Sequence, residues 1–130
     1  MSPETLLIVD DNETNLKLAR VLLSADGYQV RTALDAQSAM ASIREVRPAL
    51  ILMDIQLPGM DGLTLTRQLK KDPLTRDIVV IAMTAYAMKG DQQKALAAGC
   101  DGYLSKPIDT RALSGTIAEF LSRVSNTAGK

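Results

Sequence analysis

Short, unbroken runs of aliphatic residues alternate along the chain with longer segments in which apolar residues recur every three or four positions. Such runs are typical of buried strands, and the longer segments are typical of helices that bury one face. The pattern predicts five strands, at residues 6–9, 30–33, 50–53, 78–83 and 102–105. A polar residue follows the end of each predicted strand within two positions.

The segments between these strands carry the start and stop signals of helices. Asp35 is placed to cap the second helix, and Asp26-Gly27 is placed to end the first. The third helix is predicted at 61–71 and the fourth at 89–98, and a polar tail expected to fray begins at 125. The apolar positions at helical spacing in the first and last helices are Leu18, Val21, Leu22 and Ala25, and Leu113, Ile117, Phe120, Leu121 and Val124.

This order of elements predicts the class of fold. Five alternations of strand and helix indicate an α/β fold, with a parallel sheet covered by helices on both faces. In the common five-stranded order, the first and third strands are neighbours. Ligands of such sheets bind beyond the carboxyl ends of the strands, so the polar residues at those ends are the candidates for a functional site.

Composition and charge exclude several classes of function. A chain of 130 residues is expected to form one domain, which we place at 1–125, with a tail at 126–130. The 15 basic and 15 acidic side chains balance, which argues against direct nucleic-acid binding. The chain has no histidine and a single cysteine, Cys100, which excludes histidine-based catalysis, an internal disulfide framework and a histidine or multi-cysteine metal site. No apolar run exceeds six residues, so we expect no membrane association and a reduced, cytoplasmic protein.

Candidate chemistry gathers at the ends of the predicted strands. Asp10 and Asp11 follow the first strand, Asp54 follows the third, Thr84 the fourth and Lys106 the fifth. Because the first and third strands are expected to be neighbours, their aspartates should lie close together and repel one another. A bound cation would offset this repulsion. Oxygen ligands without imidazole or thiolate indicate a hard ion, Mg²⁺ first.

A carboxylate surrounded by Mg²⁺, an ammonium group and a hydroxyl group is a receptor for a phosphoryl group. Asp54 is the candidate nucleophile, which would form an aspartyl phosphate. Taken singly, each of these residues has an ordinary structural explanation: Asp10 or Asp11 as a helix cap, Thr84 as a loop cap, Lys106 as a surface lysine. The set as a whole favours the phosphoryl site.

These motifs together resemble the receiver domain of two-component response regulators, over about residues 5–124. The resemblance rests on Asp10-Asp11, Asp54, the loop Pro58-Gly59-Met60-Asp61-Gly62, Thr84-Ala85 and Lys106-Pro107. It implies a flavodoxin-like (βα)5 fold with strand order 2-1-3-4-5.

The resemblance also implies a role for each site residue. Asp54 corresponds to the phosphoacceptor, and Asp11 directly and Asp10 partly through water would hold Mg²⁺, for which Mn²⁺ could substitute. The backbone carbonyl of Gln56 corresponds to a further metal ligand. Thr84 would hydrogen-bond the phosphoryl oxygens, and Lys106 would pair with them.

Four more positions follow from the same resemblance. Tyr103 corresponds to the aromatic switch residue that moves inward as Thr84 moves toward the phosphate, although on its own it would be read as a packing residue. The Lys106–Pro107 peptide bond is usually cis in this family. Gln56 and Tyr86 lie where the family varies, and they are expected to tune the lifetime of the phosphoryl group.

The expected function is therefore that of a single-domain response regulator, a switch and not an enzyme beyond intrinsic self-phosphorylation and self-dephosphorylation. Its phosphoryl group would come from a sensor histidine kinase or a histidine phosphotransfer protein, and its output would be contact with a downstream protein effector. Three alternatives stay open: a receiver cut from a larger regulator or hybrid kinase, a docking module that is not phosphorylated, and an aspartate-nucleophile phosphatase. The last is disfavoured because residues 10–14 read Asp-Asp-Asn-Glu-Thr instead of Asp-x-Asp-x-Thr.

Overall fold

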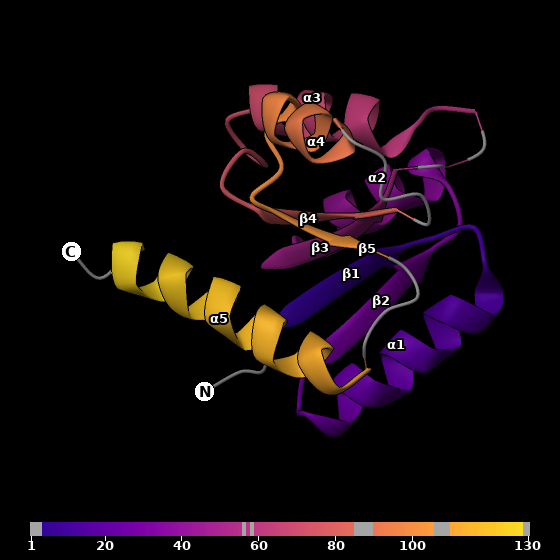
Figure 1. Ribbon diagram of the computed structural model, residues 1–130, viewed down its shortest axis with the longest axis vertical. Helices are drawn as coiled ribbons and strands as arrows, with labels where there is room; N and C mark the ends of the chain where they lie inside the picture. The colour runs from indigo at the N-terminus through magenta and orange to yellow at the C-terminus, as the bar shows by residue number, and fades with distance from the viewer. Residues whose placement is uncertain (1–3, 56, 58, 85–89, 106–109, 129–130) are drawn as a thin grey trace.

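The computed structural model describes residues 4–55, 57, 59–84, 90–105 and 110–128 and places a single parallel sheet at its centre (Figure 1). The sheet has five strands in the order β2-β1-β3-β4-β5, which confirms the predicted topology. The strands are β1 (Thr5–Val9), β2 (Gln29–Ala33), β3 (Leu50–Asp54), β4 (Val79–Thr84) and β5 (Gly102–Ser105). All four strand pairs are parallel, so the carboxyl ends of the strands meet at one edge.

Helices cover both faces of the sheet, as Figure 1 shows. Helices α2, α3 and α4 lie on one face, and α1 and α5 lie on the other. Their bounds are α1 (Glu13–Ala25), α2 (Ala36–Glu45), α3 (Gly62–Lys71), α4 (Asp91–Ala98) and α5 (Thr110–Ala128). Within the described residues, no helix is both long enough and apolar enough to span a bilayer.

Alternate residues of each central strand point to opposite faces and build two aliphatic cores. In β1, Leu7 and Val9 pack toward α2, α3 and α4, whereas Leu6 and Ile8 pack toward α1 and α5. Strand β3 is buried along its whole length, which explains why its sequence is a continuous apolar run ended by Asp54. Among the described residues, the fully buried core contains no aromatic side chain, which agrees with the aliphatic runs of the predicted strands.

The apolar positions at helical spacing in α1 are not the ones that the helix buries most deeply. The structure buries Leu16, Ala19 and Leu23, while Leu18 is 48% exposed and Val21 is 68% exposed. Apolar residues lie on more than one side of this helix, so periodicity alone admits two faces. The packing of α1 on the sheet selects the face that begins at Leu16.

Most helix ends agree with the sequence signals. Asp35 caps α2, since its carboxylate accepts a hydrogen bond from the Ser38 backbone N–H at 2.8 Å. Asp26 is the C-cap of α1, and Gly27 follows it with a φ of 96°, which favours glycine. The last helix extends further than predicted, because α5 runs to Ala128 through most of the segment expected to fray.

Candidate functional site

The carboxyl ends of β1 and β3 bring three aspartates together. Val9 pairs with Met53 in the register of these strands, so Asp10 and Asp54 follow side by side. One carboxylate oxygen each from Asp10, Asp11 and Asp54 lies within 4.8 Å of the others. Asp10 is 1% exposed and Asp54 3% exposed, whereas Asp11 is exposed. Two buried carboxylates and one exposed carboxylate thus lie together at one edge of the sheet.

The first turn of α1 fixes the orientation of Asp10. The Asn12 backbone N–H donates to Oδ1 of Asp10 at 2.9 Å, and the Asn15 carboxamide donates to Oδ2 at 3.3 Å. The Asp10 backbone N–H donates to the Ala33 carbonyl oxygen at 3.1 Å, which extends the pairing between β1 and β2 by one residue. Asn12, rather than Asp10 or Asp11, is the N-cap of α1. The capping explanation of these two aspartates is therefore excluded.

The backbone that follows Asp54 is fixed by two hydrogen bonds of Ile55. The Ile55 N–H donates to the Met83 carbonyl oxygen at 2.9 Å, and the Gly62 N–H donates to the Ile55 carbonyl oxygen at 2.9 Å. A Cβ atom at Gly62 would lie 2.1 Å from the Asp54 carbonyl oxygen, which no side chain can accommodate without movement. Asp61 caps α3 by accepting the Thr64 N–H at 2.7 Å. The Asp61-Gly62 pair therefore lets α3 begin directly against the residue that carries the candidate nucleophile.

Thr84 ends β4 at the same edge of the sheet and is 2% exposed. Met83 pairs with Asp54, so Thr84 lies one residue beyond the Asp54 level on the neighbouring strand. Tyr103 on β5 pairs with Ala82 on β4 and packs, partly buried, against the core beneath α2, α3 and α4. Both residues occupy the region that the sequence assigned to them.

Four predicted site residues, Gln56, Tyr86, Lys106 and Pro107, lie outside the described residues. Their expected roles as a metal ligand, a lifetime-tuning position, a phosphate partner and a structural proline remain predictions.

The donor atoms that the structure brings together fit a hard divalent cation. All three side chains of the cluster offer carboxylate oxygens, and Mg²⁺ takes oxygen ligands. A cation at this place would offset the mutual repulsion of three negative charges held within 4.8 Å. The buried environment of Asp10 and Asp54 strengthens that repulsion, because charges interact more strongly where water is excluded.

Sequence reasoning missed the residues that support the aspartates. Asn12 and Asn15 carry no charge. The sequence signal that could have pointed to Asn12 is local, because asparagine is among the favoured residues at helix N-caps. Gly62 lies in a recognised motif, but its role depends on the close approach of α3 to β3, which only the folded chain shows.

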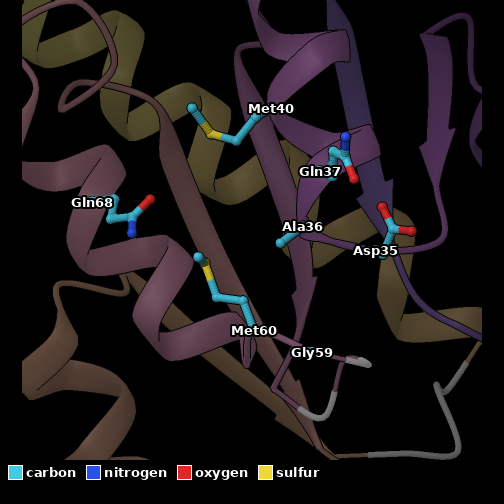
Figure 2. Close-up of a pocket in the computed structure, with 7 residues that line it drawn as sticks. All are labelled: Asp35, Ala36, Gln37, Met40, Gly59, Met60 and Gln68. Atoms are coloured by element: carbon cyan, nitrogen blue, oxygen red, sulfur yellow. The ribbon is translucent and has the colours of Figure 1, made fainter.

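A hollow lies between the start of α2 and α3, and Figure 2 shows Asp35, Met40, Met60 and Gln68 around it. Its volume is about 490 Å³. Two hydrogen bonds from Ser38 lower the pKa of the Asp35 carboxyl. The backbone N–H has the larger effect and the hydroxyl group the smaller one. Among the described residues of this lining, Asp35 is the single charged one, and it is engaged as a helix cap, so the hollow offers little chemistry beside the aspartate cluster.

Cys100 is buried beneath α3 and α4, and its thiol lies 3.9 Å from the Thr66 hydroxyl group. Burial raises the pKa of the Cys100 thiol, so it stays protonated at neutral pH. It is a packing residue of the core.

Comparison with known proteins agrees with this geometry. The family model of the response regulator receiver domain matches residues 6–118. A polar-differentiation response regulator, DivK, of Brucella anthropi is 47% identical over 119 residues, which are 92% of this chain and 97% of that protein. Its counterpart in Brucella ovis is 46% identical over 91% of this chain and 96% of that protein.

Solved structures share the same fold. A CheY-like response regulator receiver domain protein of Methanospirillum hungatei superposes with a TM-score of 0.90 at 33% identity, covering 97% of this chain and 99% of that one. The receiver domain of a sensor histidine kinase of Pseudomonas aeruginosa, whose crystal structure has a magnesium ion coordinated in the active site cleft, gives a TM-score of 0.83 at 32% identity, covering 92% of this chain and 98% of that one. The family match and the identity to the regulators establish the same conclusion: the chain belongs to the response regulator receiver family.

Proposed function

We propose that this protein is a phosphorylation switch in which Asp54 accepts a phosphoryl group at a Mg²⁺ site formed with Asp10 and Asp11. The observation that carries the proposal is the convergence of these three carboxylates within 4.8 Å at the carboxyl edge of the sheet. Asp54 ends a fully buried strand, and its backbone is fixed through Ile55 and Gly62. A nucleophile held so rigidly is positioned for attack on an incoming phosphorus atom.

The chemical step is a transfer between two proteins. A carboxylate oxygen of Asp54 forms the new bond to phosphorus while the bond between phosphorus and the imidazole nitrogen of the donor breaks, and the donor imidazole leaves. This chain contains no histidine, so the donor belongs to another molecule, a sensor histidine kinase or a histidine phosphotransfer protein. The Thr84 hydroxyl group and the Lys106 ammonium group would bind the phosphoryl oxygens.

The bound cation would be held by Asp11 directly, by Asp10 partly through water, by Asp54 and by the backbone carbonyl of Gln56. Mg²⁺, or Mn²⁺ in its place, supplies positive charge that offsets the negative charge of the transferring group. The exposed Asp11 and the buried Asp10 support this division of roles, because a cation entering from solvent meets Asp11 first.

Phosphorylation replaces the single negative charge of the Asp54 carboxylate by a phosphoryl group that carries about 1.5–2 negative charges, and these charges would draw Thr84 and Lys106 toward them. Tyr103 would move inward with Thr84, and the surface around α4, β5 and α5 would then contact a downstream protein effector. Gln56 and Tyr86 would set the lifetime of the phosphoryl group. The protein would act in the cytoplasm as a single-domain regulator, composed of a receiver domain at 1–125 and a tail at 126–130, by protein–protein contact and without direct binding to DNA or membranes.

The test is phosphorylation of the full chain by acetyl phosphate, read as the intact mass with and without Mg²⁺. We expect a Mg²⁺-dependent gain of one phosphoryl group in the wild type and none in Asp54→Asn. Asp77→Asn is the matched control, because it removes an exposed carboxylate away from the cluster; it should be phosphorylated like the wild type. Absence of a gain in the wild type, confirmed with a phosphohistidine protein as donor, would refute the switch mechanism in favour of a docking module.

A further inference from the structure

Asn15, in the first turn of α1, reaches back to the aspartate cluster. It is half-buried, and its carboxamide nitrogen donates a hydrogen bond to Oδ2 of Asp10 at 3.3 Å. We propose that Asn15 is a positioning residue for the metal site, which holds the Asp10 carboxylate in the orientation that receives the cation. The inference rests on the proposed function of the cluster and names a residue that this function does not yet include.

Two neutral donors from one turn of helix act on the same carboxylate. The Asn12 backbone N–H bonds to Oδ1 at 2.9 Å, and the Asn15 side chain bonds to Oδ2. Because the two donors bind different oxygens, they define the plane of the Asp10 carboxylate as well as its position. They also stabilise its negative charge without bringing a positive side chain that would compete with the cation.

The side chain of Asn15 is not required to begin the helix. Asn12 already caps α1, since its side-chain oxygen accepts the backbone N–H groups of Thr14 at 2.9 Å and of Asn15 at 3.2 Å. Alanine at position 15 would keep both of these bonds and has a higher helix propensity than asparagine. Loss of the Asn15 carboxamide therefore removes support from Asp10 while leaving the helix start intact.

Helix stability and metal-site geometry favour different residues at this position. An acidic residue three positions after the N-cap stabilises a helix through capping and through the helix dipole. At position 15 the same residue would place a fourth carboxylate beside Asp10, Asp11 and Asp54. The two explanations of Asn15, a helix residue or a positioning residue, thus predict opposite effects of Asn15→Asp.

The test measures metal binding without any phosphoryl donor. Urea unfolding of the full chain is followed by circular dichroism at increasing MgCl₂, and the rise of the midpoint gives the apparent dissociation constant. We expect Asn15→Ala to weaken Mg²⁺ binding about tenfold, as loss of a residue that orients a metal ligand does; the affinity of each variant is read from the rise of its midpoint above its own value in EDTA. Thr14→Ala, at an exposed neighbour on the same turn, should bind Mg²⁺ like the wild type.

Asn15→Asp provides the second readout. Its midpoint in EDTA should fall below the wild-type value, because the added charge faces Asp10, and Mg²⁺ should restore it. Wild-type Mg²⁺ affinity in Asn15→Ala, or an Asn15→Asp midpoint in EDTA at or above the wild type, would overturn the inference alone. A wild-type midpoint that does not respond to Mg²⁺ would overturn the proposed metal site and this inference with it.

Discussion

Gly62→Ala tests whether α3 must begin in contact with the residue that carries the nucleophile. The added Cβ would lie 2.1 Å from the Asp54 carbonyl oxygen, about 1.3 Å short of ordinary van der Waals contact at 3.4 Å. The obstructing atoms belong to the backbone of Asp54, so rotation of a side chain cannot relieve the overlap. Either α3 or the end of β3 has to move.

The magnitude follows from two opposing effects. Atoms forced into a packed region cost about 1–3 kcal/mol, and the upper end applies here because the contact is with backbone. Alanine has a helix propensity about 1 kcal/mol more favourable than glycine. The free energy of unfolding should therefore fall by about 2 kcal/mol, and phosphorylation of Asp54 by acetyl phosphate should slow.

The assay is urea unfolding followed by circular dichroism, with Gly115→Ala as the matched control. Gly115 is an exposed helical glycine in α5, and a Cβ there would meet nothing within 4 Å. The control should become more stable by about 0.5–1 kcal/mol, since only the propensity effect remains. A Gly62→Ala protein as stable as the wild type, beside a control that behaves as expected, would refute the steric argument.

Two further predictions concern the supporting structure. Lys70→Met should lower the free energy of unfolding by about 1–3 kcal/mol, because the Lys70 ammonium group donates to the Ile78 carbonyl oxygen at 2.8 Å and to Asp101 at 2.9 Å; Lys71→Met, at an exposed neighbour, should change it little in the same urea assay. Cys100 should resist labelling by a thiol reagent until the protein unfolds. Burial raises the pKa of the folded Cys100 thiol. The protonated thiol therefore contributes stability that is present below the unfolded pKa of about 8.5 and is lost as pH rises through the folded pKa. Above about pH 8.5, the urea midpoint of the wild type should then fall more steeply with pH than the midpoint of Cys100→Ala. Equal dependence of the two midpoints on pH would contradict the raised pKa of the Cys100 thiol.

The sequence was sufficient for the sheet because its signals are local and redundant. Strand β3 is buried on both faces, so its five residues form one apolar run ended by an aspartate. Parallel strands then place the residues after β1 and β3 at one edge, which made the convergence of Asp10, Asp11 and Asp54 predictable. The carboxylates at these positions also predicted a site for a hard cation.

The sequence was less informative where two packing arrangements of an element fit its residue pattern about equally well. Helix α1 carries apolar residues on two sides, and only packing on the sheet shows that Leu16 is buried and Val21 is 68% exposed. The contact of Asn15 with Asp10 depends on the rotation of that helix about its axis, so it could not be deduced from spacing. The close approach of Gly62 to Asp54 depends on the angle at which α3 leaves the sheet.

The most direct measurement locates the phosphoryl group on the chain. The 130-residue chain is phosphorylated with acetyl phosphate and Mg²⁺ and then treated with borohydride, which reduces an aspartyl phosphate to homoserine, and the digested peptides are sequenced by mass spectrometry. We expect homoserine at position 54 and unmodified aspartate at positions 10 and 11. Homoserine at position 10 or 11, with Asp54 unmodified, would contradict the assignment of Asp54 as the phosphoacceptor.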